Sequence, residues 1–258
     1  MSYHAPQFEV SMAQTPDDIR AAQRLRYDVF VRELGGAGAL VDHEQQLERD
    51  RYDENALHLL LKDRARPEDD QVVGVYRLLT KERAQQSGQF YCADEFDLSI
   101  LEQSGKRLLE LGRSCLHADY RGGAGMMHLW GALSDLAERE KIEVMFGAAS
   151  FHGTDLERLA APLSLLHDRH LAPQELRVTA QGDTAVALNM RPADQIDRVA
   201  AMRDTPALIK AYLRLGGTVG DGAFVDHAFN TTDICLILAA DAVSGLQRAI
   251  YGKGRTRV

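Results

Sequence analysis

The chain has 258 residues, of which 45% are hydrophobic and 26% charged, a composition typical of a folded globular protein rather than a disordered one. Its 30 basic and 38 acidic residues give a net charge of −8, which argues against a duplex nucleic-acid binder. The longest apolar run, Ile234 to Ala240, is far shorter than the roughly 20 residues of a membrane-spanning helix. With no signal-peptide pattern at its start, we expect the protein to be cytoplasmic.

The first third of the chain predicts a strand, a helix and a hairpin. Residues 8–13 alternate weakly, as in a strand. Thr15, followed by Pro16 and Asp18, resembles a capping box, so a helix should begin there and end at the glycine pair Gly35–Gly36. Residues 42–54 are polar and predict a loop. Residues 57–61 and 72–79 predict two antiparallel strands joined by a polar connection.

The rest of the chain alternates predicted strands and helices. The expected elements are strands over 108–116, 144–149, 186–190 and 233–239, and helices over 126–141, 156–167 and 207–215. This order predicts an α/β fold with a mixed, mostly antiparallel sheet flanked by helices. We expect one domain over residues 1–258, with a C-terminal elaboration at about 190–258.

The predicted strand over 108–116 contains an unusual carboxylate. Strand alternation places Glu110, Gly112 and Ser114 on one face, with Arg113 on the other. A carboxylate inside an apolar strand is costly to bury unless it is paired or used chemically. Glu110 is therefore either a functional group or one half of a structural ion pair.

A glycine-rich turn follows that strand and opens the next predicted helix. Arg121, Gly122 and Gly123 lie where free N–H groups and the helix dipole would favour an anion such as a phosphate. The alternative is simply tight packing between strand and helix. The three cysteines, Cys92, Cys115 and Cys235, form no CxxC pair, so we expect reduced thiols and no metal site.

This layout of strand, turn and helix resembles the GNAT N-acyltransferase fold. The turn departs from the usual acetyl-CoA pattern, because Ala124 and Met126 occupy the positions of a glycine and a small residue. Two branches that use acyl carrier protein fit better. One is the acyl-homoserine-lactone synthases, matched by Arg26-x-x-x-Phe30, Asp50-x-x-Asp53, Gly74-x-x-Arg77 and Glu110-x-x-Arg113, although their tryptophan after the phenylalanine motif is missing here.

The second branch is similar over more of the chain. It comprises the ornithine N-acyltransferases of ornithine-lipid synthesis, also labelled hemolysin-like proteins. The matching blocks are RLRYDVF at 24–30, FY at 90–91, EFD at 95–97, ELGRSC at 110–115, HADYR at 117–121, LW at 129–130, GAASFHG at 147–153, LIKAYLRLG at 208–216 and VDHAFNTTD at 225–233.

The resemblance implies transfer of a (3-hydroxy)fatty acyl group from acyl carrier protein to the α-amine of ornithine, with no bound cofactor beyond the phosphopantetheine of the donor. Glu110 is expected to act as general base. Ser150 or Tyr120 would protonate the departing thiolate. Backbone N–H groups near Arg113–Cys115 would stabilise the thioester oxyanion, so that Ser114 and Cys115 join Arg121, Gly122 and Gly123 in binding the donor.

Other residues are expected to bind the amino acid. Arg26, Arg77 and Arg113 either clamp its carboxylate or pair with Asp50 and Asp53 in a structural network. Phe30 and Phe151 line a pocket or belong to the core, and Asp233 orients the amine or fixes a turn. The side-chain ammonium of ornithine calls for a carboxylate from residues 42–54 or from Glu95, whereas glutamine, the alternative acceptor, needs only amide hydrogen bonds.

The expected partner, acyl carrier protein, is acidic and needs a basic surface to dock on. Two segments qualify: residues 20–32, with Arg20, Arg24, Arg26 and Arg32, and the tail from Asp241 to Val258. The tail, with the apolar face of the helix over 207–215, is an alternative for peripheral contact with the inner face of the membrane. A lactone synthase using S-adenosylmethionine and a non-catalytic lipid-binding protein remain as rival functions.

Overall fold

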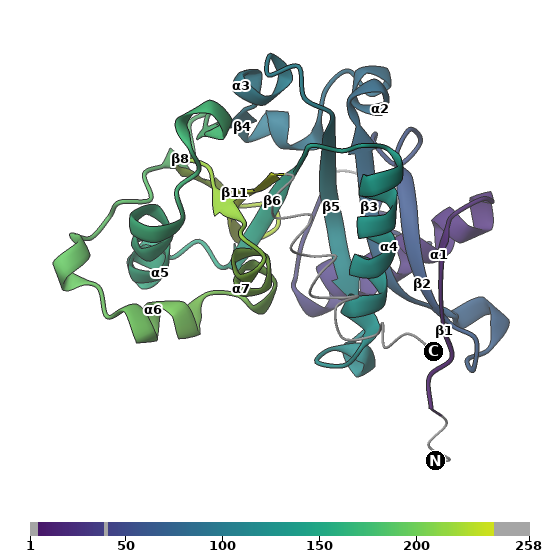
Figure 1. The fold of residues 1–258 in the computed structure, drawn as a ribbon. Coiled ribbons are helices and arrows are strands. Elements are labelled where there is room, and N and C mark those ends of the chain that lie inside the picture. The colour runs from purple at the N-terminus through teal and green to yellow at the C-terminus, as the bar shows by residue number, and fades with distance from the viewer. Residues whose placement is uncertain (1–4, 39–40, 240–258) are drawn as a thin grey trace, which may run out of the picture. The chain divides into compact units, whose positions relative to one another are not determined.

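The computed structural model describes residues 5–38 and 41–239 (Figure 1). The basic tail from Asp241 onward, a candidate docking segment, lies outside the described residues. The described residues divide into two compact units, one made of those up to Gln89 with Leu111–Glu140, the other of Phe90–Glu110 with Lys141–Ala239. Strand β5 (Leu108–Leu116) contributes residues to both units.

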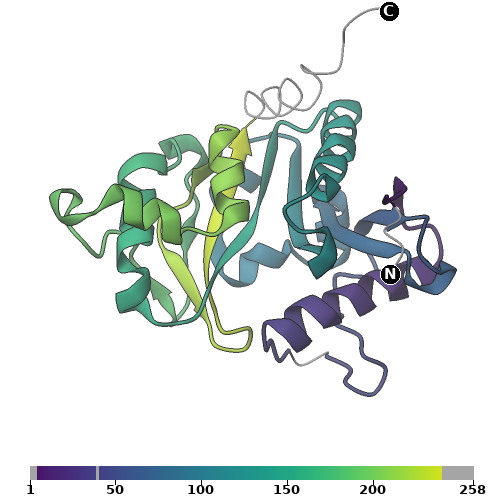
Figure 2. The ribbon, with the colours of Figure 1, turned by 90° about the horizontal axis from the view of Figure 1, so that it is seen from below.

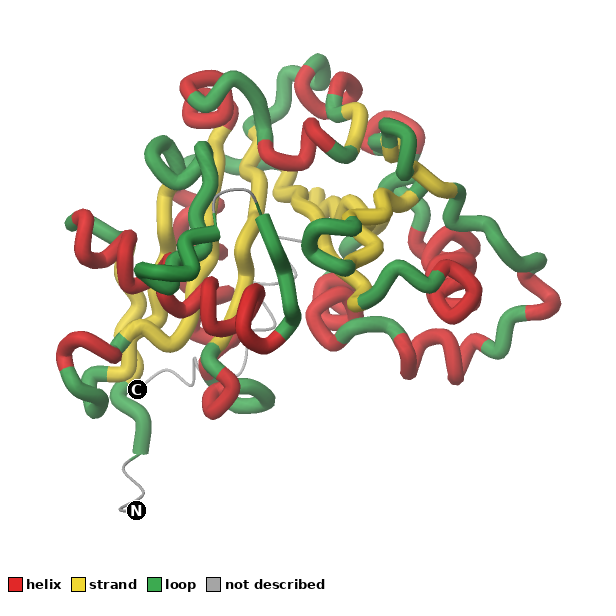
Figure 3. The backbone as a smooth tube through the Cα atoms, turned by 180° about the vertical axis from the view of Figure 1, so that it is seen from behind, coloured by secondary structure: helices red, strands yellow, loops and turns green. Residues whose placement is uncertain are grey.

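The first unit contains the strand order β1-β2-β3-β5 between two helices. The further elements are β1 (Phe8–Met12), α1 (Pro16–Arg26), β2 (Leu57–Asp63), β3 (Val72–Thr80), α2 (Lys81–Gln86) and α4 (Gly125–Arg139). β1 pairs with β2, and β2 with β3, antiparallel. Helices α1 and α4 cover opposite faces of these strands, as Figures 2 and 3 show from below and from behind.

Helix α1 begins at the predicted capping box. Thr15 Oγ1 accepts the backbone N–H of Asp18 at 3.1 Å, and the Asp18 carboxylate accepts the Thr15 N–H in return. Beyond Arg26 the helix continues as a π-helix over Tyr27–Glu33 and ends before Gly35, whose φ of 75° suits glycine. The start and end of the helical segment were predictable, whereas the π-helical turn was not.

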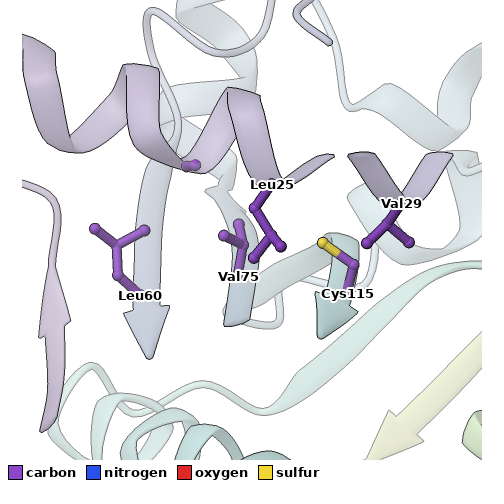
Figure 4. Close-up of a cluster of buried hydrophobic side chains, with 6 residues drawn as sticks. Leu25, Val29, Leu60, Val75 and Cys115 are labelled. Carbon is purple, nitrogen blue, oxygen red and sulfur yellow. The ribbon is translucent and has the colours of Figure 1, made fainter. Parts of the chain in front are cut away.

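A hydrophobic cluster holds α1 against the sheet. Leu25 and Val29 of the helical segment meet Leu60, Val75 and Cys115 of the strands, as Figure 4 shows. On the α4 side a Cβ at Gly74 would lie 2.7 Å from Leu116 Cδ2 and 3.1 Å from Leu129 Cδ1. A Cβ at position 74 would therefore force the Leu116 side chain to shift, so glycine favours this close packing.

The second unit is built around the order β5-β6-β11-β10-β8, with the first residues of β5 at one end. β6 pairs with β5 in parallel over Leu108–Glu110, and β6 pairs with β11 antiparallel along its whole length. The elements, apart from β5, are η3 (Tyr91–Asp94), β4 (Phe96–Asp97), α3 (Ser99–Glu102), β6 (Val144–His152), α5 (Leu156–His170), β7 (Thr179–Ala180), β8 (Ala185–Val186), α6 (Arg198–Asp204), α7 (Ala207–Arg214), β9 (Thr218–Val219), β10 (Ala223–Asp226) and β11 (Thr231–Ala239).

The expected fold class, an α/β fold with a mixed and mostly antiparallel sheet flanked by helices, is confirmed. One predicted strand is wrong: only Ala185 and Val186 pair, and the chain then turns so that the Leu188 carbonyl accepts the Ser164 hydroxyl at 3.0 Å. The apolar face of α7 is also not a membrane surface, because Ile209 and Tyr212 are buried and the helix packs on β11. No helix among residues 5–38 and 41–239 is long and apolar enough to span a membrane.

Candidate active site

Five of the residues expected to bind the amino acid meet in one buried ionic network of the first unit. Arg26 pairs with Glu48 and, at 2.7 Å, with Asp53. Arg77 pairs with Asp50 at 2.5 Å and with Asp53 at 3.1 Å. The sequence left two roles open for these arginines, a clamp on the substrate carboxylate and a structural network with the aspartates. The structure shows that the ion pairs of such a network are formed.

Arg113 completes this network and also distorts its strand. Its guanidinium lies 3.1 Å from both Glu48 and Asp50. The φ of Arg113 is 50°, in the left-handed region that a non-glycine residue seldom adopts. The regular alternation expected for residues 109–114 is therefore wrong at Arg113, where the pleat of β5 is interrupted.

Glu48 is the member of the network that the sequence did not single out. It lies in the polar segment predicted as a loop and is 1% exposed. Burial alone raises the pKa of its carboxyl, but the charges of Arg113 and Arg26 outweigh burial and hold the pKa at about 2, below the ordinary 4.5. Its only signal in the sequence was its position two residues before Asp50.

We expect the free energy of unfolding to fall on acidification from pH 4.5 to pH 2. In this window the unfolded chain binds a proton at Glu48 that the folded chain does not, which costs about 3 kcal/mol of stability by pH 2. Urea unfolding at a series of pH values measures how steeply the free energy of unfolding changes with pH, and Glu48→Gln should reduce this slope. Asp28→Asn, which affects the exposed pair with Arg32, is the matched control. A slope unaltered by Glu48→Gln contradicts this assignment.

Glu110 is held in place by backbone N–H groups of the second unit. Its carboxylate accepts the N–H of Tyr91 at 2.8 Å and the N–H of Cys92 at 2.6 Å, and the residue is 2% exposed. Because each oxygen accepts one of these bonds, the orientation of the carboxylate is fixed relative to the η3 turn. Two backbone N–H groups are therefore among the partners of Glu110, which also takes part in other interactions.

All three cysteine thiols are free and buried. Burial, with the nearby Glu110 carboxylate, raises the pKa of Cys92 well above its ordinary value, and burial raises the pKa of Cys115 to about 12. Burial and Glu110 raise the pKa of Cys235 as well. The Cys92 sulfur accepts the N–H of Ala148 at 3.1 Å.

The two residues expected to protonate the thiolate have different surroundings. The Tyr120 hydroxyl donates to Asp63 at 2.7 Å, and burial together with that carboxylate raises the pKa of Tyr120. Ser150 is exposed on β6, where it lies opposite Asp233 of β11. Asp233 in turn lies close to Glu95 and Asp226.

The glycine-rich turn does not leave its arginine available to a phosphate. Arg121 donates to Glu33 at 2.7 Å through Nη2, again to Glu33 through Nη1, and to the Leu116 carbonyl at 3.1 Å through Nε. Gly122 has a φ of 74°, as a tight turn requires, and Gly123 is exposed. All three nitrogens of the guanidinium are therefore already bonded within the first unit.

The remaining expected residues lie in or beside the cores of their units. Cys115 belongs to the cluster in Figure 4, and Phe30 packs against that cluster. Phe151 is 1% exposed on β6. Ser114 is half-buried, and its buried hydroxyl has no hydrogen-bond partner among the described residues.

The basic surface expected over residues 20–32 is not continuous. Arg26 is fully buried and so cannot belong to it, and Arg32 pairs with Asp28. Arg20 and Arg24 line a hollow of about 550 Å³ whose charges balance, four basic against four acidic. The charged lining residues are Asp17, Asp18, Arg20, Arg24, Lys62, Arg64, Glu68 and Asp69.

Comparisons of the sequence place the chain among characterised relatives. An acetyltransferase (GNAT) domain model matches residues 25–131. The chain is 53% identical over 246 residues to an L-ornithine N(alpha)-acyltransferase of Rhodobacter capsulatus, covering 95% of this chain and 94% of the relative. It is 40% identical to an L-ornithine N(alpha)-acyltransferase of Brucella abortus, covering 96% of this chain and 90% of that protein.

Solved structures share the fold at low sequence identity. The acyl-homoserine-lactone synthase LasI superposes with a TM-score of 0.51 at 15% identity, covering 96% of each chain. The CoA-dependent synthase BjaI superposes with a TM-score of 0.52 at 14% identity, covering 95% of this chain and 90% of that one. At these identities the likeness concerns the fold alone.

Proposed function

Since the chain belongs to the L-ornithine N(alpha)-acyltransferase family, we propose that it transfers a (3-hydroxy)fatty acyl group from acyl carrier protein to the α-amine of ornithine. The observation that supports this most strongly is the identity of 53% across 95% of the chain. The product is the monoacylated precursor of an ornithine lipid. No cofactor is needed beyond the phosphopantetheine that holds the acyl group on the donor.

In this proposal Glu110 accepts the proton of the α-amine, directly or through a water. An ammonium has no lone pair, so the amine must lose a proton before it attacks the thioester carbonyl. Two backbone N–H groups hold the carboxylate, one on each oxygen, so its orientation is fixed. Glu110 is thus a buried carboxylate of fixed orientation.

The departing thiolate needs a proton, and Ser150 is the better of the two candidates. The Tyr120 hydroxyl already donates to Asp63, and its raised pKa keeps that proton in place. Ser150 is exposed, and its hydroxyl donates to no acceptor among residues 5–38 and 41–239. The thioester oxyanion would be stabilised by a backbone N–H near Arg113–Cys115, where the left-handed turn of Arg113 redirects the chain.

The donor is proposed to be an acyl carrier protein rather than coenzyme A. The turn at residues 121–125 lacks the usual small-residue spacing, and the Arg121 guanidinium is engaged by Glu33 and Leu116. A pyrophosphate would have to displace those bonds. Ser114, Gly122 and Gly123 are then proposed to contact the pantetheine arm, while Cys115 acts through packing.

The arginines of the buried network are proposed to position the segment that contains Glu48, Asp50 and Asp53. Each arginine is paired with two carboxylates, so a substrate carboxylate would have to compete with these existing pairs. Phe30 and Phe151 are likewise proposed to shape the site through packing.

A location in the cytoplasm, with peripheral contact at the inner face of the membrane, belongs to this proposal. The acylated amino acid is an amphiphile that partitions into lipid, so release at a membrane surface would remove the product. The described residues contain no spanning helix, which is compatible with attachment from one side.

The purified full-length chain should form acyl-ornithine from 3-hydroxyacyl carrier protein and ornithine, detected by mass spectrometry. Substituting the matching acyl-CoA should lower the rate at least tenfold if the carrier protein is recognised. Formation of acyl-glutamine instead of acyl-ornithine contradicts the acceptor. A product that depends on S-adenosylmethionine assigns the chain to lactone synthesis, and no acyl-amino acid with any donor overturns the enzymatic proposal.

A further inference from the structure

Cys92 of the η3 turn contacts the proposed base through both its backbone and its side chain. Its N–H donates to Glu110 Oε1 at 2.6 Å, and its thiol is hydrogen-bonded to the same carboxylate. Because an ionised carboxylate can only accept, the thiol is the donor of the second bond. Cys92 is 1% and Glu110 2% exposed, so both bonds are shielded from bulk water.

The sulfur of Cys92 is also bonded to β6. The parallel pairing of β5 with β6 ends at Glu110, and on β6 the Val144 N–H donates across this pairing to the Arg107 carbonyl at 3.2 Å. Residues two apart in a strand direct their N–H groups to the same side, so the Ala148 N–H also faces this side. It donates to Cys92 Sγ at 3.1 Å. Cys92 therefore takes up a strand N–H directly beyond the last β5 residue that pairs with β6.

Other titratable groups around this contact are Glu95, which follows η3, and Cys235 of β11. Burial, Glu110 and Glu95 raise the pKa of Cys92, and the same three influences raise the pKa of Cys235. Both thiols therefore stay protonated at neutral pH and add no charge beside Glu110. The Cys235 thiol donates to the Leu236 carbonyl at 3.8 Å. Cys92 and Cys235 are thus two buried thiols of the same unit that donate to different acceptors.

We propose that Cys92 is a positioning residue for the general base, with its thiol donating to the Glu110 carboxylate while its sulfur accepts the Ala148 N–H. This inference rests on the proposed function, in which Glu110 accepts the proton of the α-amine. The base is then attached to η3 through two backbone N–H groups and to β6 through the Cys92 sulfur. Cys92 acts on the reaction only through Glu110.

The bond donated by the thiol has a specific consequence for the base. A hydrogen bond donated to a carboxylate stabilises the charged form of that group and lowers its pKa. The charged form is the one that can take a proton from an ammonium. Glu110 therefore remains able to act as a base at a lower pH with the thiol than without it, whatever its other interactions contribute.

The test compares Cys92→Ala with Cys92→Ser. The two variants differ by one hydroxyl, which can donate to the carboxylate and accept the Ala148 N–H as the thiol does. We expect the alanine variant to move the acidic limb of kcat/KM for acyl-ornithine formation upward by about one pH unit, because the carboxylate has lost a donor. The serine variant should keep this limb close to its wild-type position.

Cys235→Ala is the matched control, since it removes an equally buried thiol that donates to the Leu236 carbonyl. It should leave the position of the acidic limb unchanged. An acidic limb that stays in place in Cys92→Ala overturns the proposal. Equal shifts in Cys92→Ala and Cys92→Ser also overturn it, because the packing of the sulfur rather than its hydrogen would then act on the base.

Infrared spectroscopy of the full chain tests the bond without any acyl transfer. Subtracting the spectrum of Cys92→Ser from that of the wild type isolates the S–H stretching band of Cys92. We expect this band at a lower frequency than that of Cys235, and at a higher frequency when the subtraction is repeated with Glu110→Gln, whose amide is a weaker acceptor than a carboxylate. A band that Glu110→Gln does not move refutes the bond, even where the wild type acylates no amino acid or the alanine variant does not fold. A band that moves in a chain without activity supports the bond and contradicts only the proposed function.

Discussion

Replacing Glu110 by glutamine is expected to lower kcat/KM for acyl transfer by about 100-fold or more. An amide cannot take the proton of the amine. It also presents an NH₂ group to one of the two backbone N–H groups that the carboxylate now accepts, from Tyr91 and Cys92. The measurement is the rate of acyl-ornithine formation across pH, with Glu175→Gln as a matched change of an exposed carboxylate in the same unit.

The dependence of kcat/KM on pH distinguishes a general base from a residue that only holds the η3 turn in place. If Glu110 takes the proton, the acidic limb of kcat/KM should disappear in the glutamine variant as the rate falls. If Glu110 serves only to hold the η3 turn, the rate falls but the limb keeps its position. A variant that retains most of the wild-type rate removes Glu110 from the mechanism.

Replacing Arg26 by methionine is expected to destabilise the chain by about 3–5 kcal/mol. Methionine fills much of the same space but leaves Glu48 and Asp53, both nearly inaccessible to water, without one of their partners. Urea unfolding followed by circular dichroism gives the change in the free energy of unfolding.

Arg32→Met is the appropriate comparison, because the ion pair of Arg32 with Asp28 is about half-exposed on both sides. Exposed pairs contribute about 0–1 kcal/mol, so this variant should remain close to the wild type. A loss below 1 kcal/mol for Arg26→Met would mean that the remaining arginines compensate both carboxylates by themselves.

Local patterns in the sequence predicted the regular elements well. The capping box at Thr15 determines where α1 begins, and the apolar run of β5 has the bounds that alternation indicated. These features depend on residues a few positions apart. The two-residue strand β8 could not be recognised, because it is a strand only through its pairing with β10, and its own residues give no signal of that pairing.

The site was less predictable, since its members come from distant segments. The sequence offered a structural network and a substrate clamp as alternatives for three arginines. That the network includes Glu48 could not be predicted, because Glu48 approaches Arg113 from 65 residues away. Glu95 was one of several carboxylates that could meet an ammonium. Its association with Asp226 depends on the pairing of β10 with β11 and on the η3 turn, neither of which has a local signature.

All three cysteines are buried, which bears on the proposed transfer of an acyl group from a thioester donor. A thiolate competes with an amine for such a donor, and its acylation would trap the enzyme as an inert adduct. Here the pKa values of Cys92, Cys115 and Cys235 are all raised, so the sulfurs stay protonated at neutral pH. If the donor is the thioester proposed above, the three thiols are not expected to compete with the amine for its acyl group.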